Sequence, residues 1–432
     1  MKFQVSNTKL KRIAVFLVLL YAFGTRSILA RYVFGTQVQL LAFYIITYFL
    51  LFWGLFTSFT SIKDGPHVYV PKKFFSVLLI SLVIIVGLFV TNDTYTLLYY
   101  GLALLLPFSV IINDGEKYSG AKAFIIVGII ATIGSILNYI FPTIYKTIIP
   151  YFFSGYSLNS LQWLIEERTF FPGFFSQVNY TAFFIGLAIG TLFIFRKYCF
   201  SRSWGFWLLF LAFGMLLTGK RGAFVYVIIA FVFVYFLEGE GREKFRRVIS
   251  IAAILIGVYF LLYIVAHVSS IPSIERIFYA VNDFLLNGTP EDAGREQLHH
   301  QAWTYFYQHP VFGIGWDNFK EVFTARGTHV HCIYLQLLCE TGIVGAVIFY
   351  CFFAFSLIST IRNFYRYKNE NIAIGMWLEF SIFIQVYFLL FGITENPIYD
   401  VEEMILYMYA IGLSNITVAS QPSMVTEQLY YG

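Results

Sequence analysis

Charged side chains are scarce in this chain. They make up 12% of its 432 residues, whereas hydrophobic side chains make up 59% and include 50 phenylalanines and 32 tyrosines. In soluble domains about a quarter of the residues are charged. The composition therefore excludes an ordinary soluble globular domain.

Cysteines are also few. Cys199, Cys332, Cys339 and Cys351 lack the paired spacing of a zinc site or a redox motif, so no disulfide framework is expected. The sequence shows no internal repeat strong enough to indicate the inverted halves of a transporter, and no low-complexity tail.

Long apolar runs dominate what is present. A hydrocarbon core of about 30 Å needs roughly 20 apolar residues at about 1.5 Å rise per residue, so each such run predicts a transmembrane helix. The first run lacks a cleavage site of small residues, and we expect it to be retained instead of being removed as a signal peptide. We predict about twelve transmembrane helices, near 12–30, 37–59, 74–91, 95–112, 123–141, 178–195, 203–218, 222–237, 248–267, 341–360, 372–393 and 398–418.

Basic residues orient these helices. With the N-terminus inside, 19 of the 29 lysines and arginines fall in segments on the inner side, which agrees with the positive-inside rule. The net charge of +5 is thereby explained without a nucleic-acid partner.

This orientation predicts the fold and its parts. We expect an all-α polytopic membrane protein with a large, partly helical extracytoplasmic loop before the tenth transmembrane helix. Helices one to nine lie in 1–268, with a smaller outer loop at 142–177. The large loop covers 269–330, and helices ten to twelve with a cytoplasmic tail cover 331–432.

The smaller outer loop and a tight turn supply the first candidate site residues. The 142–177 loop is rich in aromatic residues, which fits either a segment at the lipid headgroups or a substrate-lining wall. The turn Thr218-Gly-Lys220-Arg221-Gly222 places two cations outside, where the orientation rule does not require them. Glycines there let the backbone approach a ligand closely. The alternative is that both cations contact lipid phosphates.

The large loop holds a predicted helix. Thr289-Pro290-Glu291-Asp292 has the residues of a helix start, and the helix should end before Pro310. Arg295, His299, Trp303 and Phe306 fall on one face of it. Aromatic packing along that face could hold Arg295 as a phosphate clamp, or the helix could lie on the membrane with Arg295 exposed.

Histidines cluster in the same loop. Five of the seven lie in this loop or directly after it, at His331, and His329-Val-His331 has a spacing that a metal site could use. No carboxylate or cysteine set accompanies the pair in a recognisable pattern. A neutral imidazole acting as a base at the lipid interface is the better interpretation, because histidine titrates near neutral pH.

These motifs resemble the bacterial O-antigen ligase/polymerase superfamily. The similarity lies in Leu217-Thr-Gly-Lys-Arg-Gly-Ala223, in Gly294-Arg295 with Trp303 and His309-Pro-Val-Phe-Gly-Ile-Gly-Trp316, and in His331-Cys-Ile-Tyr-Leu-Gln336 followed by Glu340-Thr-Gly-Ile-Val-Gly345. Two positions depart from the family pattern. Lys220 stands where serine is usual, and Cys332 where asparagine commonly follows the histidine.

The resemblance implies a transferase of the bacterial inner membrane. Its donor would be an oligosaccharide on undecaprenyl diphosphate, and its site would face outward. Arg221 and Arg295 would hold the diphosphate, and His331 would be the base, with no metal and no cofactor. We further expect Lys220, His299, Trp303 and His329 to bind substrate.

The motifs leave the acceptor open. We expect a polymerase of capsule, O-antigen or exopolysaccharide repeat units, working with the chain-length regulator and flippase of its pathway. A ligase acting on lipid A-core or another acceptor is the alternative. A lipid-linked oligosaccharide flippase would need charges spread along a central cavity, and a structural scaffold would not require grouped cations and histidines.

Overall fold

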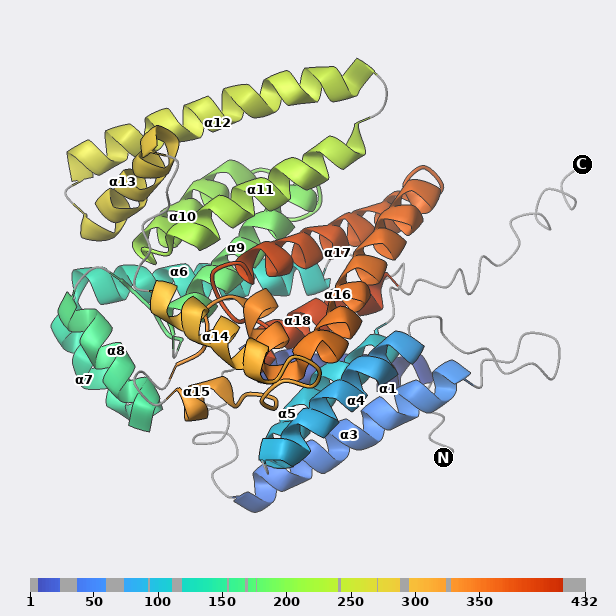
Figure 1. Ribbon diagram of the computed structural model, residues 1–432. Coiled ribbons are helices and arrows are strands. Elements are labelled where there is room, and N and C mark those ends of the chain that lie inside the picture. The colour runs from blue at the N-terminus through green and yellow to red at the C-terminus, as the bar shows by residue number, and fades with distance from the viewer. Residues whose placement is uncertain are drawn as a thin grey trace, which may run out of the picture.

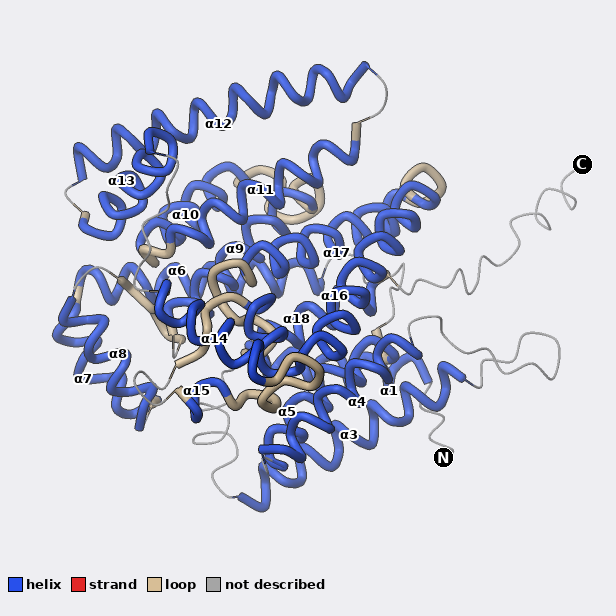
Figure 2. Tube along the Cα trace, viewed as in Figure 1, coloured by secondary structure: helices blue, strands red, loops and turns tan. Residues whose placement is uncertain are grey.

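The computed structural model describes residues 7–23, 37–59, 74–91, 94–110, 119–153, 155–167, 170–175, 177–239, 242–269, 271–287, 295–323 and 328–414. Within these ranges every regular element is helical, and none is a strand (Figure 2).

The N-terminal half forms two groups of helices. One group lies at the lower right of Figure 1. Its members are α1 (Asn7–Phe23), α3 (Gln37–Phe59), α4 (Phe74–Thr91), α5 (Thr94–Leu105) and the 3-10 helix η2 (Leu106–Phe108). The other comprises α6 (Ser119–Ile140), α7 (Pro142–Phe152), α8 (Gly155–Glu167), α9 (Val178–Ile194), α10 (Trp204–Leu217) and α11 (Arg221–Glu238).

The second half begins with the long α12 (Arg242–Ser269), followed by α13 (Pro272–Asn287), α14 (Glu296–Gln308) and the single turn α15 (Phe319–Val322). The chain then continues through α16 (Ile333–Tyr367), α17 (Ile372–Phe391) and α18 (Val401–Leu413). α17 packs against α9, α11, α16 and α18, so it lies at the centre of the bundle (Figure 1).

Burial separates central helices from peripheral ones. In the most apolar stretch of α17, 78% of the residues are buried within the protein, against 6% in that of α12. Exposed apolar side chains such as Phe245, Ile256 and Val268 cover α12. An apolar surface of this extent is stable in hydrocarbon and not in water. Five of the described helices, namely α6, α11, α12, α16 and α17, are long and apolar enough to cross a membrane, so the chain is a multi-pass membrane protein.

A described helix overlaps each predicted transmembrane segment, but several boundaries differ from the prediction. The predicted 341–360 segment is only part of α16, which begins at Ile333 and bends at Gly342, where φ is +63° and ψ is −171°. The described part of α1 is Asn7–Phe23, and the remainder of the predicted 12–30 segment lies outside the described residues. The predicted helix start at 289–292 lies outside the described residues.

The outer elements of the predicted topology gather at one end of the bundle. α7, α8, α13, α14 and α15 lie at the left in Figure 1, and the connections after α11 and α16 lie at the opposite end. This arrangement brings three distant segments together: the α10–α11 turn, the 269–331 region and the α17–α18 connection.

Candidate functional site

A buried carboxylate, Glu395, lies at the centre of the site. It belongs to the α17–α18 connection and is 4% exposed. One carboxylate oxygen, Oε1, lies 3.0 Å from Lys220 Nζ and 3.5 Å from Arg295 Nη2. The other, Oε2, accepts a hydrogen bond from Asn179 Nδ2 at 2.7 Å and lies 3.3 Å from His331 Nδ1. Three residues predicted from sequence therefore meet at one group that was not predicted.

The charge of Glu395 is maintained by its neighbours. Burial by itself raises the pKa of a carboxyl group. Here Lys220, His331 and Arg295 together outweigh burial and hold the pKa of Glu395 far below its ordinary value. Glu395 is therefore ionised throughout the neutral range and acts as a fixed negative charge under the two cations and the imidazole.

His331 is held in an unusual conformation between two partners. Its φ of 58° lies in the left-handed region, which side chains other than glycine seldom adopt. Nδ1 faces Glu395, and Nε2 lies 3.3 Å from Thr328 Oγ1. Because an ionised carboxylate can only accept, the proton of a neutral imidazole belongs on Nδ1. Nε2 then carries the lone pair and is the atom that can act as a base.

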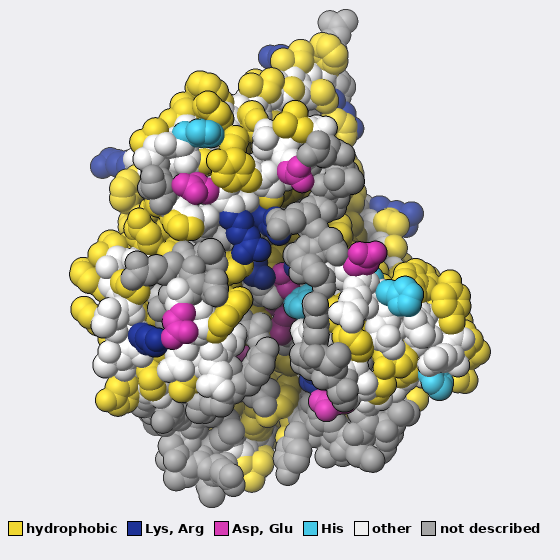
Figure 3. All heavy atoms as spheres, turned by 60° about the vertical axis from the view of Figure 1, so that its left-hand side comes forward, with side chains coloured by type: hydrophobic (Ala, Val, Ile, Leu, Met, Phe, Trp, Pro, Cys, Tyr) yellow, Lys and Arg dark blue, Asp and Glu magenta, His cyan; other side chains and the backbone are white. Residues whose placement is uncertain are grey.

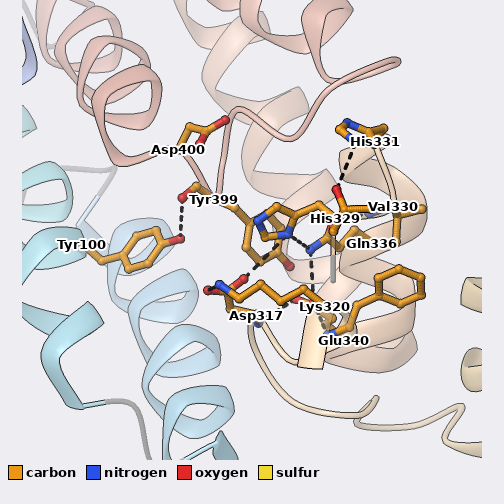
Figure 4. Close-up of polar contacts among 12 residues, drawn as sticks. Tyr100, Asp317, Lys320, His329, Val330, His331, Gln336, Glu340, Tyr399 and Asp400 are labelled. Carbon is orange, nitrogen blue, oxygen red and sulfur yellow. Dashed lines mark hydrogen bonds and ion pairs between the residues drawn. The ribbon is translucent and has the colours of Figure 1, made fainter. Parts of the chain in front are cut away.

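His329 belongs to a polar network with Gln336 and Glu340 (Figure 4). Gln336 Nε2 lies 2.9 Å from His329 Nδ1 and donates to Glu340 Oε1 at 3.1 Å, while Gln336 Oε1 accepts from the Val330 amide at 3.1 Å. Burial, followed by the charge of Lys320 and then His331, lowers the pKa of His329 to about 3. His329 is therefore neutral near pH 7, and its Nδ1 serves as an acceptor.

The sequence prediction of the packed face of α14 was wrong. Leu298 and Ala302 are the buried residues of this helix, whereas Trp303 is 43% exposed and stacks on Tyr307. Trp303 thus packs on Phe306 and Tyr307 of its own helix, and not against the core. The ion pair with Glu395 holds Arg295, which occupies the N-cap position of α14. The helix ends at Gln308, two residues before Pro310, as predicted.

The 310–315 turn docks onto the bend of α16 by backbone hydrogen bonds. The amides of Ile314 and Gly315 donate to the carbonyls of Cys339 and Glu340, at 3.1 and 2.9 Å. In return, the amide of Ile343 donates to the carbonyl of Pro310 at 2.9 Å. The Glu340 carboxylate accepts from the amides of Asp317 and Phe319 at 2.8 and 3.0 Å. This exchange fixes α14 relative to the segment that carries His331.

A cavity of about 720 Å³ opens above Glu395. It lies within the range typical of ligand sites. In Figure 3 lysine and arginine side chains gather in a hollow, with acidic and histidine side chains beside them. The lining includes Ser160, Trp163, Leu164, Phe170, Gln177, Asn179, Lys220, Arg276, Arg295, Lys320, Thr328, His329, His331, Glu395 and Asp400.

Four of the predicted site residues line this cavity and three do not. Lys220, Arg295, His329 and His331 contribute to its wall. Arg221, the first residue of α11, and His299 and Trp303 on α14 are not part of the lining. The glycine-rich turn thus presents Lys220 to the cavity, and its neighbour Arg221 stands one residue away.

Sequence reasoning missed Glu395 and Arg276. Arg276 lies on α13, with its guanidinium 4.4 Å from the centre of the Phe170 ring. α13 is amphipathic: Ser273, Ile274 and Ile277 are buried, and Arg276 is not, a pattern that could have drawn attention to it. Glu395 sits in a short connection with no motif around it, and only its spatial neighbours identify it.

The cavity carries a positive balance near neutral pH. Lys220, Arg276, Arg295 and Lys320 line it, against the carboxylates Glu395 and Asp400. Four cations thus face two carboxylates in this lining, and the site favours an anionic ligand. Within the described ranges no group of three or more His, Cys, Asp or Glu side chains is arranged to hold a metal ion.

Residues 205–350 match a family model described as O-antigen ligase. The matched part includes Lys220, Arg221, Arg295 and His331, and it ends before Glu395. No curated protein matches the chain.

Proposed function

We propose a reaction from the premise that residues 205–350 match a family model described as O-antigen ligase. The family supports a membrane enzyme that transfers glycosyl groups. The specific proposal is transfer of a glycan from undecaprenyl diphosphate to a sugar hydroxyl, with polymerisation of repeat units as the physiological role. The enzyme would work on the outer face of the bacterial inner membrane.

One observation carries the proposal: a histidine and two cations share a single buried carboxylate at the wall of a cationic cavity. A sugar hydroxyl stays protonated at neutral pH, so it needs a base to become a nucleophile. His331 Nε2 can accept that proton, because Glu395 fixes the proton of the neutral ring on Nδ1. Glu395 also stabilises the imidazolium that forms, as a carboxylate partner of a catalytic histidine does.

The cations act on the leaving group. The bond from the anomeric carbon to the diphosphate oxygen breaks as the hydroxyl oxygen attacks, and the electron pair leaves with the diphosphate. Arg295 lies 3.5 Å from Glu395 and carries a planar guanidinium, whose fork of N–H donors matches the oxygens of a phosphate group. Lys220 adds a second positive charge at the same place, and we assign Arg221 to the same diphosphate. Attack in a single displacement inverts the anomeric carbon.

The test replaces each histidine separately in purified protein supplied with a lipid-linked donor and acceptor. We expect His331→Ala to lower transfer by at least a thousandfold and still bind donor, because it removes the base. His329→Ala should keep measurable activity, since its imidazole lies in the supporting network. Equal activity of the His331→Ala variant and the unsubstituted enzyme would remove the assigned base.

The acceptor is decided by a second measurement. In a strain lacking this protein, a single repeat unit on the acceptor indicates a polymerase. Acceptor without glycan, together with accumulated lipid-linked polymer, indicates the ligase alternative.

A further inference from the structure

We propose that the cavity-facing side of α8, formed by Ser160, Trp163 and Leu164, is a saccharide-binding subsite, with Gln177 as a further polar contact. The inference deepens the proposed function, on which it rests, by placing one sugar ring of a glycan substrate against the indole of Trp163.

The two sides of α8 differ in their surroundings. Leu161 is fully buried and packs with Tyr145, Ile149 and Phe153 in a small core between α7 and α8. Ser160, Trp163 and Leu164 lie on the side that lines the cavity, and Trp163 is 54% exposed. The helical hairpin formed by α7 and α8 is thus stabilised by its own core. Trp163 is not part of that core.

The indole of Trp163 has no ring or hydrogen-bond partner among the described residues. A large aromatic side chain that faces a polar cavity leaves apolar area in water. The axial C–H groups of a pyranose ring form an apolar face that can cover the indole. The face of the aromatic ring is negative, so it attracts the slightly positive hydrogens of these C–H groups. Diphosphate alone has no such face.

Polar groups around the indole complete the chemistry for a sugar. Ser160 lies one turn before Trp163 on α8, and Gln177 stands at the N-cap position of α9 without a capping hydrogen bond from its side chain. Hydroxyl and amide side chains donate and accept, which matches sugar hydroxyls. Two residues after Gln177, Asn179 donates to Glu395 at 2.7 Å. The subsite is therefore continuous with the reacting centre.

A membrane-anchoring role accounts for other aromatic residues of this hairpin, but not for Trp163. Tyr151 on α7 is 65% exposed and is not part of the cavity wall, as expected of a side chain at the headgroups. Trp163 faces a cavity that also contains Lys220, Arg276 and Glu395. Tyr151→Ala is therefore a matched control on the same hairpin.

The experiment measures binding to full-length protein in nanodiscs, in a His331→Ala background that prevents turnover. Two probes separate the parts of the substrate: water-soluble oligosaccharides released by mild acid from the host's surface glycan, and undecaprenyl diphosphate without sugar. We expect Trp163→Ala to weaken oligosaccharide binding at least tenfold, Trp163→Phe to restore part of it, and Tyr151→Ala to change neither probe. Binding of undecaprenyl diphosphate should be the same in all variants.

The outcomes distinguish this subsite from the proposed reaction. Oligosaccharide binding that Trp163→Ala leaves intact, or weakens no more than Tyr151→Ala does, would overturn the subsite even if transfer is observed. Selective loss of that binding supports the subsite even if the unsubstituted enzyme transfers no glycan. In otherwise active enzyme, Trp163→Ala should raise the KM for either the donor or the acceptor. The substrate whose KM rises is the one whose glycan occupies the subsite. An unchanged KM for both contradicts it.

Discussion

At the residue scale, Glu395 organises the site. It is surrounded by Asn179, Lys220, Arg295 and His331, which come from four separate segments of the chain. A buried ion that loses its partner costs several kcal/mol, so this carboxylate and its cations depend on each other. The same negative charge sets the tautomer of His331. One group thus links the positions of His331, the proposed base, and the cations.

Glu395→Gln should lower the rate of transfer by about a hundredfold or more, because the amide has no charge to hold the His331 proton on Nδ1 or to stabilise the imidazolium. Single-turnover rates with bound donor measure this effect. Glu321→Gln is the control, because Glu321 is an exposed residue of α15. This substitution should leave the transfer rate unchanged. A Glu395→Gln enzyme with unchanged single-turnover rate would contradict the assigned role.

The pKa of His329 makes folding stability depend on pH. Its value of about 3 in the folded protein is below the ordinary value near 6.5. Between these pH values the unfolded chain binds a proton that the folded protein does not, so the free energy of unfolding falls as pH drops from 6.5 towards 3. His329→Asn, which keeps an acceptor for Gln336, should reduce this fall.

Thermal unfolding between pH 7.5 and 5 checks the prediction. His300→Asn, on the exposed side of α14, is the matched control and should show the pH dependence of the unsubstituted protein. If the unfolding temperatures of the two variants follow the same pH curve, the neutral buried imidazole is not the cause.

At the element scale, the bend of α16 joins the two halves of the site. A Cβ on Gly342 would lie 2.3 Å from the backbone of Val311, and one on Gly313 would lie 2.3 Å from the backbone of Glu340. Both glycines have positive φ values. Only residues without a side chain allow the 310–315 turn and the start of α16 to exchange backbone hydrogen bonds at this distance.

Gly342→Ala should therefore lower the unfolding temperature by several degrees and reduce activity strongly, since a backbone shift would displace the segment that carries His331. Gly257→Ala is the control, because nothing lies within 4 Å of a Cβ at that position of α12. Unfolding curves and transfer rates measure the two effects. Equal tolerance of both substitutions would show that the close approach is not required.

At the scale of the whole molecule, the arrangement of charge and helices predicts the side on which the site lies. α13 and α14 lie at one end of the bundle, and the start of α12 lies at the other end (Figure 1). Arg276 on α13 and Arg295 at the N-cap of α14 line the cavity. This polarity agrees with the excess of basic residues on the predicted inner side.

Cysteines introduced at two exposed positions test the orientation. Gln308→Cys on α14 should react with a membrane-impermeant thiol reagent in intact cells, and Arg246→Cys should react only after the membrane is opened. The unsubstituted protein, with its four cysteines, gives the background. Labelling of position 308 from the inside alone would place the site on the wrong face for an outward-facing transferase.

The sequence by itself determined the class of the molecule and part of its site. Membrane-length apolar runs can satisfy their backbone only as helices, so composition was enough to predict an all-helical membrane protein. Lys220, Arg295, His329 and His331 could be identified because motifs of charged residues stand out in an apolar chain. The end of α14 before Pro310 followed from local sterics.

Tertiary structure alone decided how these residues are placed relative to one another. Glu395 lies 64 residues after His331 and 175 after Lys220, and local sequence carries no information about such a meeting. The packed face of α14 was mispredicted from the helical spacing of its aromatic residues. Which side of the helix is buried depends instead on the elements that pack against it. The roles proposed for His331 and His329 likewise depend on their contacts, because His331 faces Glu395 and His329 faces Gln336. These are contacts between helices, and only the folded chain brings them together.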